Sequence, residues 1–361
     1  MSTLETTGLS ARPTRVLVHA PNWVGDVVMA TPAFRAIRAR FPDEHITVAV
    51  TRNARPVLED SPWFDAFLEM SPADKGFFGT LRAAKRVRQG AYDVGILFTN
   101  SFRTALMMRL GRVKNIVGYA REFRRFLLTE SLSPKTEKGH YVPAPMVDYY
   151  LALCSYLGCD VSDRRLELFW RPELETDLDA YGARRGIDFS KRIVLMNPGA
   201  AFGVSKCWPA EHFARAAEML AGGRDVQVVI TCAPNERDLA RSIALESRAP
   251  VVSLHDEPSG LALLKPLVRR AAVMITNDTG PRHYAAALDT PVVTIFGPTD
   301  PRWSDTGFAK EISVSASAEC APCQRPNCRT DHRCMRRITP ESVVAAAGEL
   351  MDTFPKTRGH G

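Results

Sequence analysis

One short turn in the last third of the chain holds residue types that could bind a phosphate group. Asp278, Thr279 and Gly280 follow an apolar run typical of a buried strand, and His283 falls in the first turn of the helix expected next. The first backbone N–H groups of a helix lack partners within the helix and attract anions. The turn therefore predicts a site where the backbone N–H groups of Thr279 and Gly280 meet phosphate oxygens. An Asp N-cap followed by a surface His would have the same pattern.

A second loop combines glycines with a lysine. Gly199 and Gly203 flank small residues, and Ser205 and Lys206 come just before a helix. A loop that offers backbone N–H groups, a hydroxyl and an ammonium group suits a pyrophosphate. The P-loop pattern and the dinucleotide-binding GxGxxG pattern are both missing from the chain, which disfavours a dinucleotide-dependent dehydrogenase.

Two acidic residues begin helices directly after strands. Asp26 follows a turn made by Asn22, Trp23 and Gly25, where a carboxylate is placed either as a helix N-cap or as a general base. Glu236 lies in the first turn of a helix, where it either binds a ribose diol or caps the helix.

Four cysteines lie within fifteen residues near the C-terminus. Their spacing, C-x2-C-x4-C-x5-C, matches neither the usual zinc-finger nor the ferredoxin arrangement. The sequence favours a packed or disulfide-capable loop over a zinc or iron site, so no metal site is predicted. The four residues are Cys320, Cys323, Cys328 and Cys334.

These loops need a scaffold, and the first half of the chain alternates strands with helices. Continuous apolar runs separated by helical patterns predict a parallel sheet covered on both faces. The expected strands are 14–20, 46–50, 66–70, 93–98 and 115–119, and the expected helices are 26–40, 75–89 and one that follows Ser101.

The second half restarts the pattern after a polar, charged stretch. We therefore predict an α/β protein of two doubly wound, Rossmann-like domains. The expected division is an N-terminal domain over 1–172, a hinge over 173–185, a C-terminal domain over 186–345 and a tail over 346–361.

Composition restricts the function classes. The chain is 45% hydrophobic with no apolar run of membrane-spanning length, and its first fifteen residues are expected to be a disordered lead on a cytoplasmic protein. Eleven basic residues stand against two acidic ones over 82–125, an excess of nine, whereas the whole chain has a net charge of +7. This excess indicates an anionic partner such as a phosphorylated substrate or a membrane surface, although a solvated basic surface has the same composition.

Three segments, in this order, resemble glycosyltransferase family 9, the ADP-heptose–lipopolysaccharide heptosyltransferases, and most of all their type II members. The similarity spans about 14–345. The segments are APNWVGDVVMATPAFRAIR, NPGAAFGVSKCWPAEHFA and NDTGPRHYAAALDTPVVTIFGPTDP.

The resemblance implies a GT-B fold with an inter-domain cleft and inverting, metal-independent transfer without a cofactor. It implies an N-terminal domain for a phosphorylated lipopolysaccharide-core acceptor and a C-terminal domain for ADP-heptose. Asp26 matches the family's base, Lys206 and Ser205 match its donor-phosphate loop, and Glu236 resembles its ribose-binding position. Asp278, Thr279, Gly280 and His283 match its diphosphate turn, beside which Arg282 is either a further phosphate contact or a surface charge.

The expected partners follow from this resemblance. They are ADP-heptose, the lipopolysaccharide core and, through the basic N-terminal region, the anionic inner face of the inner membrane. The alternatives are a family 9 transferase for another sugar or acceptor and, more distantly, a nucleic-acid-binding protein with a cysteine knuckle. The nucleotide-type domains argue against the last, so nucleic acid is not an expected partner.

Overall fold

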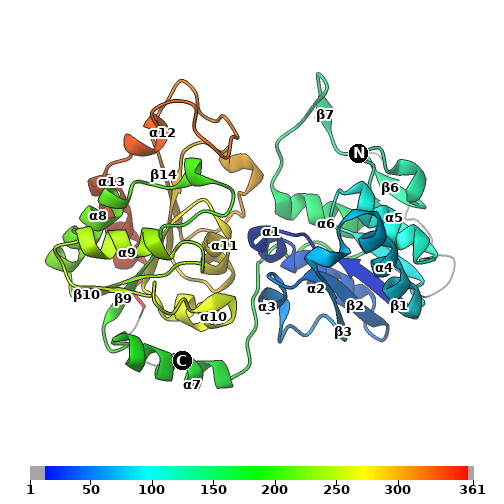
Figure 1. Cartoon of the computed structure of the whole chain (residues 1–361), viewed down its shortest axis with the longest axis horizontal. Helices are drawn as coiled ribbons and strands as arrows, with labels where there is room; N and C mark the ends of the chain where they lie inside the picture. Colours follow the sequence, from blue (N-terminus) through cyan, green and yellow to red (C-terminus); the bar gives the residue numbers. More distant parts are fainter. Residues whose placement is uncertain (1–12, 357–361) are drawn as a thin grey trace. The chain divides into compact units, whose positions relative to one another are not determined.

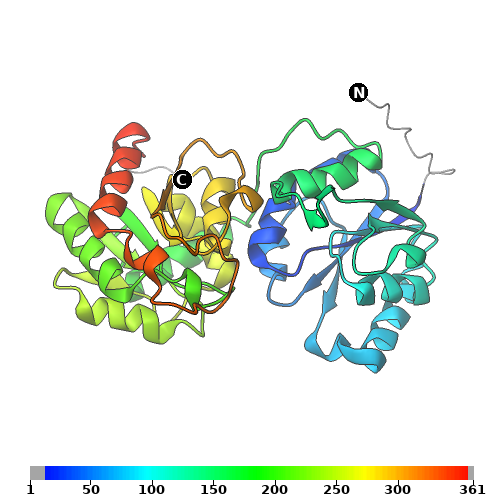
Figure 2. The same cartoon turned by 90° about the horizontal axis from the view of Figure 1, so that it is seen from above.

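The computed structural model describes residues 13–356, which form two compact units. The first contains the described residues up to Glu167 together with Arg302–Ser304, and the second contains the rest. Most of the predicted disordered lead, residues 1–12, lies outside the described residues. Figures 1 and 2 show that each unit has a twisted sheet with helices packed on it.

The first unit is built on a parallel sheet of six strands in the order β3-β2-β1-β4-β5-β6. Its strands are short apolar runs such as RVLVH, and their burial on both faces explains the lack of alternation. Helices α4 and α5 cover one face, around a core of Leu17, Leu97 and Met108. The elements are β1 (Arg15–His19), α1 (Val24–Met29), α2 (Thr31–Arg40), β2 (His45–Thr51), α3 (Arg55–Leu58), β3 (Ala66–Met70), α4 (Gly76–Gln89), β4 (Val94–Leu97), α5 (Phe102–Leu110), β5 (Asn115–Tyr119), β6 (Glu130–Leu132), the β7 (Thr136–Glu137) and β8 (His140–Tyr141) hairpin, and α6 (Met146–Tyr156).

The second unit repeats the same topology, with strand order β11-β10-β9-β12-β13-β14, again all parallel. A core cluster in this unit joins the sheet to α8, α9 and α13 and includes Trp208 and Phe213. The elements are α7 (Glu173–Arg185), β9 (Arg192–Asn197), α8 (Ala210–Gly223), β10 (Val226–Ile230), α9 (Arg237–Glu246), β11 (Val251–Ser253), α10 (Gly260–Arg270), β12 (Val273–Asn277), α11 (Gly280–Ala287), β13 (Val292–Phe296), β14 (Glu311–Ser315), α12 (Arg333–Arg336) and α13 (Pro340–Thr353).

The predicted pair of doubly wound domains is therefore confirmed, but two segments differ from the prediction. Residues 173–185, expected as a hinge, form helix α7 within the second unit, where Arg270 pairs with Glu175 at 2.6 Å. Residues 346–353, expected as part of a tail, belong to α13, and Ala347, Leu350 and Met351 are buried in the core. In α7, the charged surface concealed an apolar stripe that includes Leu174 and Leu178. Residues 357–361 of that tail lie outside the described residues.

The strand order reverses direction between β1 and β4 in the first unit and between β9 and β12 in the second. Such a switch point separates the loops at the carboxyl ends of the two central strands, and ligands of open α/β sheets bind there. The predicted site residues follow β1, β9, β10 and β12. Within residues 13–356, no helix has both the length and the apolar character that crossing a membrane would demand.

Candidate active site

The loop after β1 presents the predicted acceptor-side residues. Asn22 and Trp23 are exposed, while Gly25 and Asp26 are half-buried in the first turn of α1. The N-cap position is occupied by Trp23, so the interpretation of Asp26 as an N-cap is wrong. A carboxylate in the first turn is still favoured by the helix dipole.

Tyr150 of α6 holds the Asp26 carboxylate in place. Its hydroxyl donates a hydrogen bond to Asp26 Oδ1 at 3.3 Å, and its ring is buried. Burial and the neighbouring Asp26 charge raise the pKa of Tyr150 well above 10, because both disfavour a phenolate. Tyr150 therefore stays protonated and orients the carboxylate as a hydrogen-bond donor.

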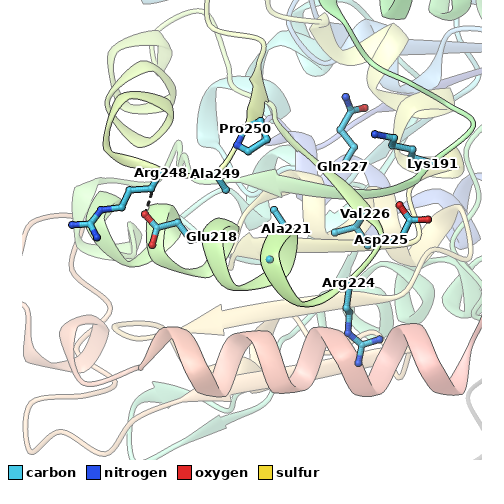
Figure 3. Close-up of a pocket in the computed structure, with 11 residues that line it drawn as sticks. Lys191, Glu218, Ala221, Arg224, Asp225, Val226, Gln227, Arg248, Ala249 and Pro250 are labelled. Carbon is cyan, nitrogen blue, oxygen red and sulfur yellow. Dashed lines mark hydrogen bonds between the residues drawn. The ribbon is translucent and has the colours of Figure 1, made fainter.

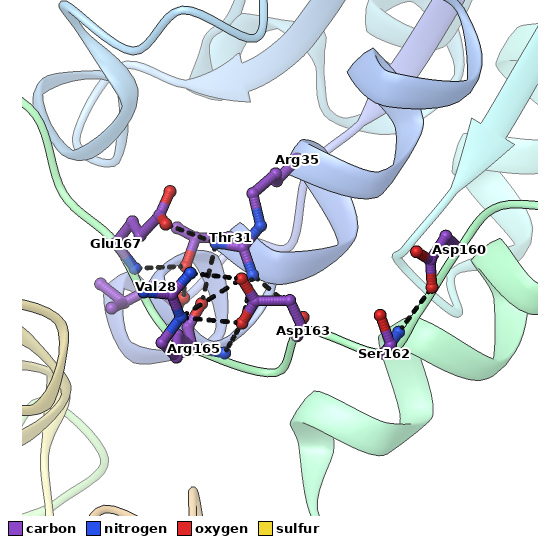
Figure 4. Close-up of polar contacts among 8 residues, drawn as sticks. All are labelled: Val28, Thr31, Arg35, Asp160, Ser162, Asp163, Arg165 and Glu167. Carbon is purple, nitrogen blue, oxygen red and sulfur yellow. Dashed lines mark hydrogen bonds and ion pairs between the residues drawn. The ribbon is translucent and has the colours of Figure 1, made fainter.

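Segment 160–167 fastens the helix pair that carries Asp26 (Figure 4). Arg35 of α2 forms ion pairs with Asp163 at 3.1 Å and with Glu167 at 2.7 Å. Thr31 Oγ1 accepts the Glu167 N–H at 3.1 Å and donates to the carbonyl of Val28 at 2.8 Å. These contacts fix the junction between α1 and α2, one turn beyond Asp26.

Two buried basic side chains lie at the same edge of this sheet. His19 ends β1 and donates through Nδ1 to the carbonyl of Ala20 at 3.0 Å, and burial lowers its pKa to about 4, so its ring is neutral. Arg124 is fully buried and donates to the carbonyls of Tyr119 at 3.0 Å and Ser101 at 3.2 Å. Burial lowers the pKa of Arg124 to about 10, which leaves it charged at neutral pH. Arg124 thus joins the loops after β4 and β5 and adds positive charge to this edge.

In the second unit, the structure brings Lys206 and Asp278 into direct contact. Lys206 Nζ lies 2.6 Å from Asp278 Oδ2 and 2.9 Å from its carbonyl oxygen, and both side chains are largely buried. The Phe202 ring lies 5.1 Å from the same ammonium group. Two predicted phosphate-binding loops, after β9 and after β12, are therefore joined across the switch point.

Asp278 belongs to a buried ion network that extends to the sheet edge. It accepts hydrogen bonds from Thr299 Oγ1 at 2.8 Å and from Arg282 Nη1 at 3.3 Å. Arg282 in turn binds Glu311 of β14 through two nitrogens, at 2.6 and 3.1 Å. Arg282 is only 3% exposed, so the interpretation of this residue as a surface charge is wrong.

The network keeps Asp278 ionised. Burial alone would raise the pKa of this carboxyl group, but the charges of Lys206 and Arg282 and the hydrogen bonds from Lys206 and Thr299 outweigh burial and lower the pKa to about 2. A permanently ionised, fully paired carboxylate is poorly suited to remove a proton and well suited to hold a turn.

The helix that follows begins as predicted. Thr279 is the N-cap of α11 and Gly280 its first residue, so their backbone N–H groups lie at the positive end of the helix. His283 is buried rather than on the surface, and burial together with the Arg282 charge lowers its pKa to about 3. His283 is therefore neutral in the absence of a ligand, and as a neutral ring it can still donate one N–H.

The Ser205 hydroxyl has a structural partner. Ser205 is buried, its Oγ donates to the carbonyl of Arg325, and its backbone N–H donates to the carbonyl of Pro326 at 3.1 Å. His332 Nε2 donates to the Ser205 carbonyl at 2.6 Å. A Cβ atom at Gly203 would come within 2.3 Å of the Pro326 oxygen, so this close approach requires glycine.

Those partners lie in the cysteine-rich segment 320–334, which therefore supports the Lys206 loop. All four of its cysteines are free thiols, and Cys334 is buried. Within residues 13–356 no cluster of three or more His, Cys, Asp or Glu side chains is arranged to hold a metal ion.

Glu236 holds the turn in front of α9. Its Oε2 accepts the backbone N–H of Ala233 at 2.9 Å, and its carboxylate lies against Gly199, where a Cβ atom would be 1.9 Å away. Glu236 therefore links the loop after β10 to the loop after β9, which also carries Lys206.

Comparison with known proteins identifies the family. Residues 80–333, more than half of the chain, match glycosyltransferase family 9 (heptosyltransferase). The chain belongs to glycosyltransferase family 9. It is 28% identical to lipooligosaccharide heptosyltransferase 2 of Haemophilus influenzae, over 93% of this chain and 99% of that protein. It is also 28% identical to lipopolysaccharide heptosyltransferase 2 of Salmonella typhimurium, over 80% and 84% of the two chains.

Solved structures share the fold of this family 9 glycosyltransferase. The structure of E. coli ADP-heptose lps heptosyltransferase II has a TM-score of 0.77 and 24% identity over 94% of this chain and 99% of that one. An E. coli heptosyltransferase solved with ADP-2-deoxy-2-fluoro heptose has a TM-score of 0.68 and 18% identity over 93% and 99%. These likenesses, with the topology above, confirm the predicted GT-B pair of domains.

A hollow of about 590 Å³ in the second unit of the glycosyltransferase lies elsewhere (Figure 3). The lining residues include Lys191, directly before β9, and Asp225 and Val226, where β10 begins. Glu218 of α8 and Arg224, the residue after that helix, also line the hollow. This is the amino edge of the sheet, opposite the edge where ligands of such sheets bind. None of the predicted site residues lines this hollow.

Sequence reasoning missed several residues that build the two sites of the glycosyltransferase. Asn277 donates to the carbonyl of Pro198 at 2.6 Å and accepts the Trp208 N–H at 3.1 Å, so it fastens the Lys206 loop to the end of β12. A polar residue closing an otherwise apolar strand was an available signal. Tyr150 and Glu311 had none, because each reaches its partner only through the tertiary fold.

Proposed function

We propose that this glycosyltransferase transfers heptose from ADP-heptose to the lipid-linked inner core of lipopolysaccharide, with inversion and without a metal ion. The relatives named heptosyltransferase 2 and the related structure with an ADP-heptose analogue support this donor and acceptor. The observation that carries the proposal is the contact between Lys206 and Asp278 at the start of α11.

In the proposed reaction, Asp26 accepts the proton of the acceptor hydroxyl as its oxygen attacks the anomeric carbon. The bond from that carbon to the ADP oxygen breaks on the opposite face of the sugar, which inverts the configuration. Tyr150 keeps the Asp26 carboxylate oriented. General-base catalysis of this kind contributes about 10²- to 10⁴-fold.

The leaving diphosphate needs a positive environment, which the second unit offers. The Lys206 ammonium has three N–H donors, and its two hydrogen bonds to Asp278 leave one donor for a phosphate oxygen. The N–H groups of Thr279 and Gly280 add the positive end of α11. Ser205 is proposed as a further phosphate-side residue and Glu236 as a contact to the adenosine ribose.

The acceptor side also needs positive charge, because the lipopolysaccharide core is anionic. Arg124 supplies part of this positive charge, because its hydrogen-bond partners within the described residues are neutral carbonyl groups. We place the protein in the cytoplasm, in peripheral contact with the anionic inner membrane that carries the acceptor.

The test is a transfer assay with purified protein, ADP-heptose and a heptosyl-Kdo-lipid A acceptor, with and without EDTA. We expect equal ADP release in both conditions and an acceptor heavier by one heptose in the mass spectrum. ADP-glucose and UDP-sugars are the control donors. Transfer from a control donor instead of ADP-heptose, or loss of transfer in EDTA, would overturn the proposal.

A further inference from the structure

Five phenylalanine side chains of the first unit are exposed to solvent. The exposed fractions reach 70% for Phe77, 80% for Phe78, 95% for Phe123 and 71% for Phe126, with Phe102 at 40%. Large apolar side chains are normally buried, and scattered single exceptions need no explanation. Five exposed phenylalanine side chains in one part of the fold do need an explanation.

The five residues lie in the three segments that follow β3, β4 and β5 at the carboxyl edge of one parallel sheet. Phe77 and Phe78 begin α4 after β3, and Phe102 begins α5 after β4. Phe126 follows β5, and its ring lies 6.0 Å from that of Phe102. Arg103 Nη1 donates to the carbonyl of Asp74 at 3.2 Å, which ties the start of α5 to the start of α4. Figure 1 shows these two helices side by side.

Packing of helix α4 does not require Phe77 or Phe78. Helix α4 buries Gly79, Thr80, Ala83, Ala84 and Val87 against the sheet. Phe77 and Phe78 stand outside that stripe and contact each other, with ring centroids 5.5 Å apart. They are therefore available to a partner.

Most of the exposed charges around them are positive. Basic side chains alternate with the phenylalanines, and the acids of the same loops are Asp74 and Glu122. Asp74 is buried and paired with Arg86 at 2.7 Å, which leaves Glu122 as the exposed acid there. We call this surface the aromatic–basic edge; its members are Lys75, Phe77, Phe78, Arg82, Phe102, Arg103, Phe123, Arg125 and Phe126.

Exposed aromatic rings beside Lys and Arg match one kind of partner closely. Membrane-surface segments place apolar rings at the headgroup boundary and basic residues against anionic lipid. The loop that carries Asp26 opens at the same edge of the same parallel sheet, because it follows the carboxyl end of β1. A bilayer seated there would bring a lipid-linked acceptor to the edge that holds the proposed base.

We propose that the aromatic–basic edge docks this glycosyltransferase on an anionic phospholipid bilayer by inserting Phe77, Phe78, Phe123 and Phe126 at the headgroup boundary. This proposal rests on the proposed function, because it identifies the surface that would bring the enzyme to a membrane-borne acceptor. The docking itself is measurable without any transfer.

The test is co-sedimentation of the full chain with phosphatidylglycerol vesicles and, separately, phosphatidylcholine vesicles. Wild type should bind the anionic vesicles, and binding should weaken with added salt, since salt screens exposed charges. Phe77→Ser/Phe78→Ser and Phe123→Ser/Phe126→Ser should each weaken binding at least about tenfold. Arg125→Glu should weaken it about tenfold, because it replaces attraction by repulsion.

Two control variants match these changes at other places. Leu245→Ser removes a 75% exposed apolar side chain from α9 of the second unit, and Arg88→Glu reverses an exposed charge at the far end of α4. Both should bind vesicles within about twofold of wild type, since neither lies on the aromatic–basic edge. Equal weakening by edge and control variants would overturn the proposal.

A second readout separates this proposal from the transfer function. Edge variants should lose activity on vesicle-embedded acceptor and keep it on a delipidated core oligosaccharide. Vesicle binding by an otherwise inactive protein would support docking while the transfer proposal fails. The docking proposal would be overturned if the wild type did not bind anionic vesicles. It would also be overturned if the wild type formed dimers through the aromatic–basic edge and the Phe variants abolished those dimers. Tighter binding to single-stranded nucleic acid than to vesicles would overturn it too.

Discussion

The two units share one strand order but differ sharply at their switch points. In the first, a half-buried carboxylate, Asp26, is oriented by a neutral tyrosine. In the second, a lysine, an aspartate, an arginine and a glutamate form a buried, mutually paired chain from Lys206 to Glu311. A common topology fixes where a ligand can bind, whereas the side chains in the loops determine the chemistry.

The difference in pairing has a chemical meaning. A carboxylate stabilised by two cations and a hydroxyl holds its charge and its position, as Asp278 does. At Asp26, the hydrogen bond from the Tyr150 hydroxyl orients the carboxylate and adds no positive charge of its own. We therefore propose that the first unit carries out the proton transfer and that the second stabilises the charge of the leaving group.

The largest expected effect comes from removing the base. Asp26→Asn keeps the size of the side chain but cannot take up the proton, so transfer should fall about 10³-fold. The measurement is initial-rate kinetics with ADP-heptose and acceptor. Asp60→Asn, in a loop of the same unit, is the control and should retain the wild-type rate. A rate within tenfold of wild type for Asp26→Asn would remove Asp26 from this role.

The next effect concerns the donor side. Lys206→Ala removes a charged hydrogen-bond donor from the diphosphate and should weaken ADP binding about thirtyfold. Isothermal titration with ADP measures it. Lys191→Ala changes an exposed lysine at the opposite edge of the same sheet and should leave ADP affinity unchanged. If the two variants bind ADP equally well, Lys206 does not contact the donor.

The ion network should also appear in the pH dependence of stability. The pKa of Asp278 is lowered in the fold, to about 2, so its contribution is present above its unfolded pKa near 3.8 and is lost as the pH falls from about 4 to 2. That contribution is roughly 2 kcal/mol. Urea unfolding of wild type and Asp278→Asn over this range measures it. The stability difference between the two should shrink toward pH 2; a constant difference would contradict the account.

The smallest effect concerns orientation. Tyr150→Phe removes the hydrogen bond to Asp26 and should lower kcat about threefold to tenfold, with little change in the KM for ADP-heptose. Tyr156→Phe, on the same helix, removes a hydroxyl that donates to Glu130 and serves as the control. An unchanged kcat for Tyr150→Phe would show that Asp26 needs no such support.

The sequence was informative wherever a single element carried the signal. Apolar strands and the loops after them predicted both sheets and the neighbourhood of Lys206 and Asp278. It could not predict Arg282 as a buried partner of Glu311, because the two meet only when β14 joins the sheet. The same limit applies to α7, whose charged sequence predicts a hinge, because its acidic residues pair with Arg270 of α10 only in the folded unit.

One measurement tests the division of roles most directly: titration of ADP into Asp26→Asn and Lys206→Ala side by side with their transfer rates. The account predicts that Asp26→Asn binds ADP like wild type and does not transfer, whereas Lys206→Ala binds ADP weakly. Equal loss of ADP affinity in both variants would contradict it.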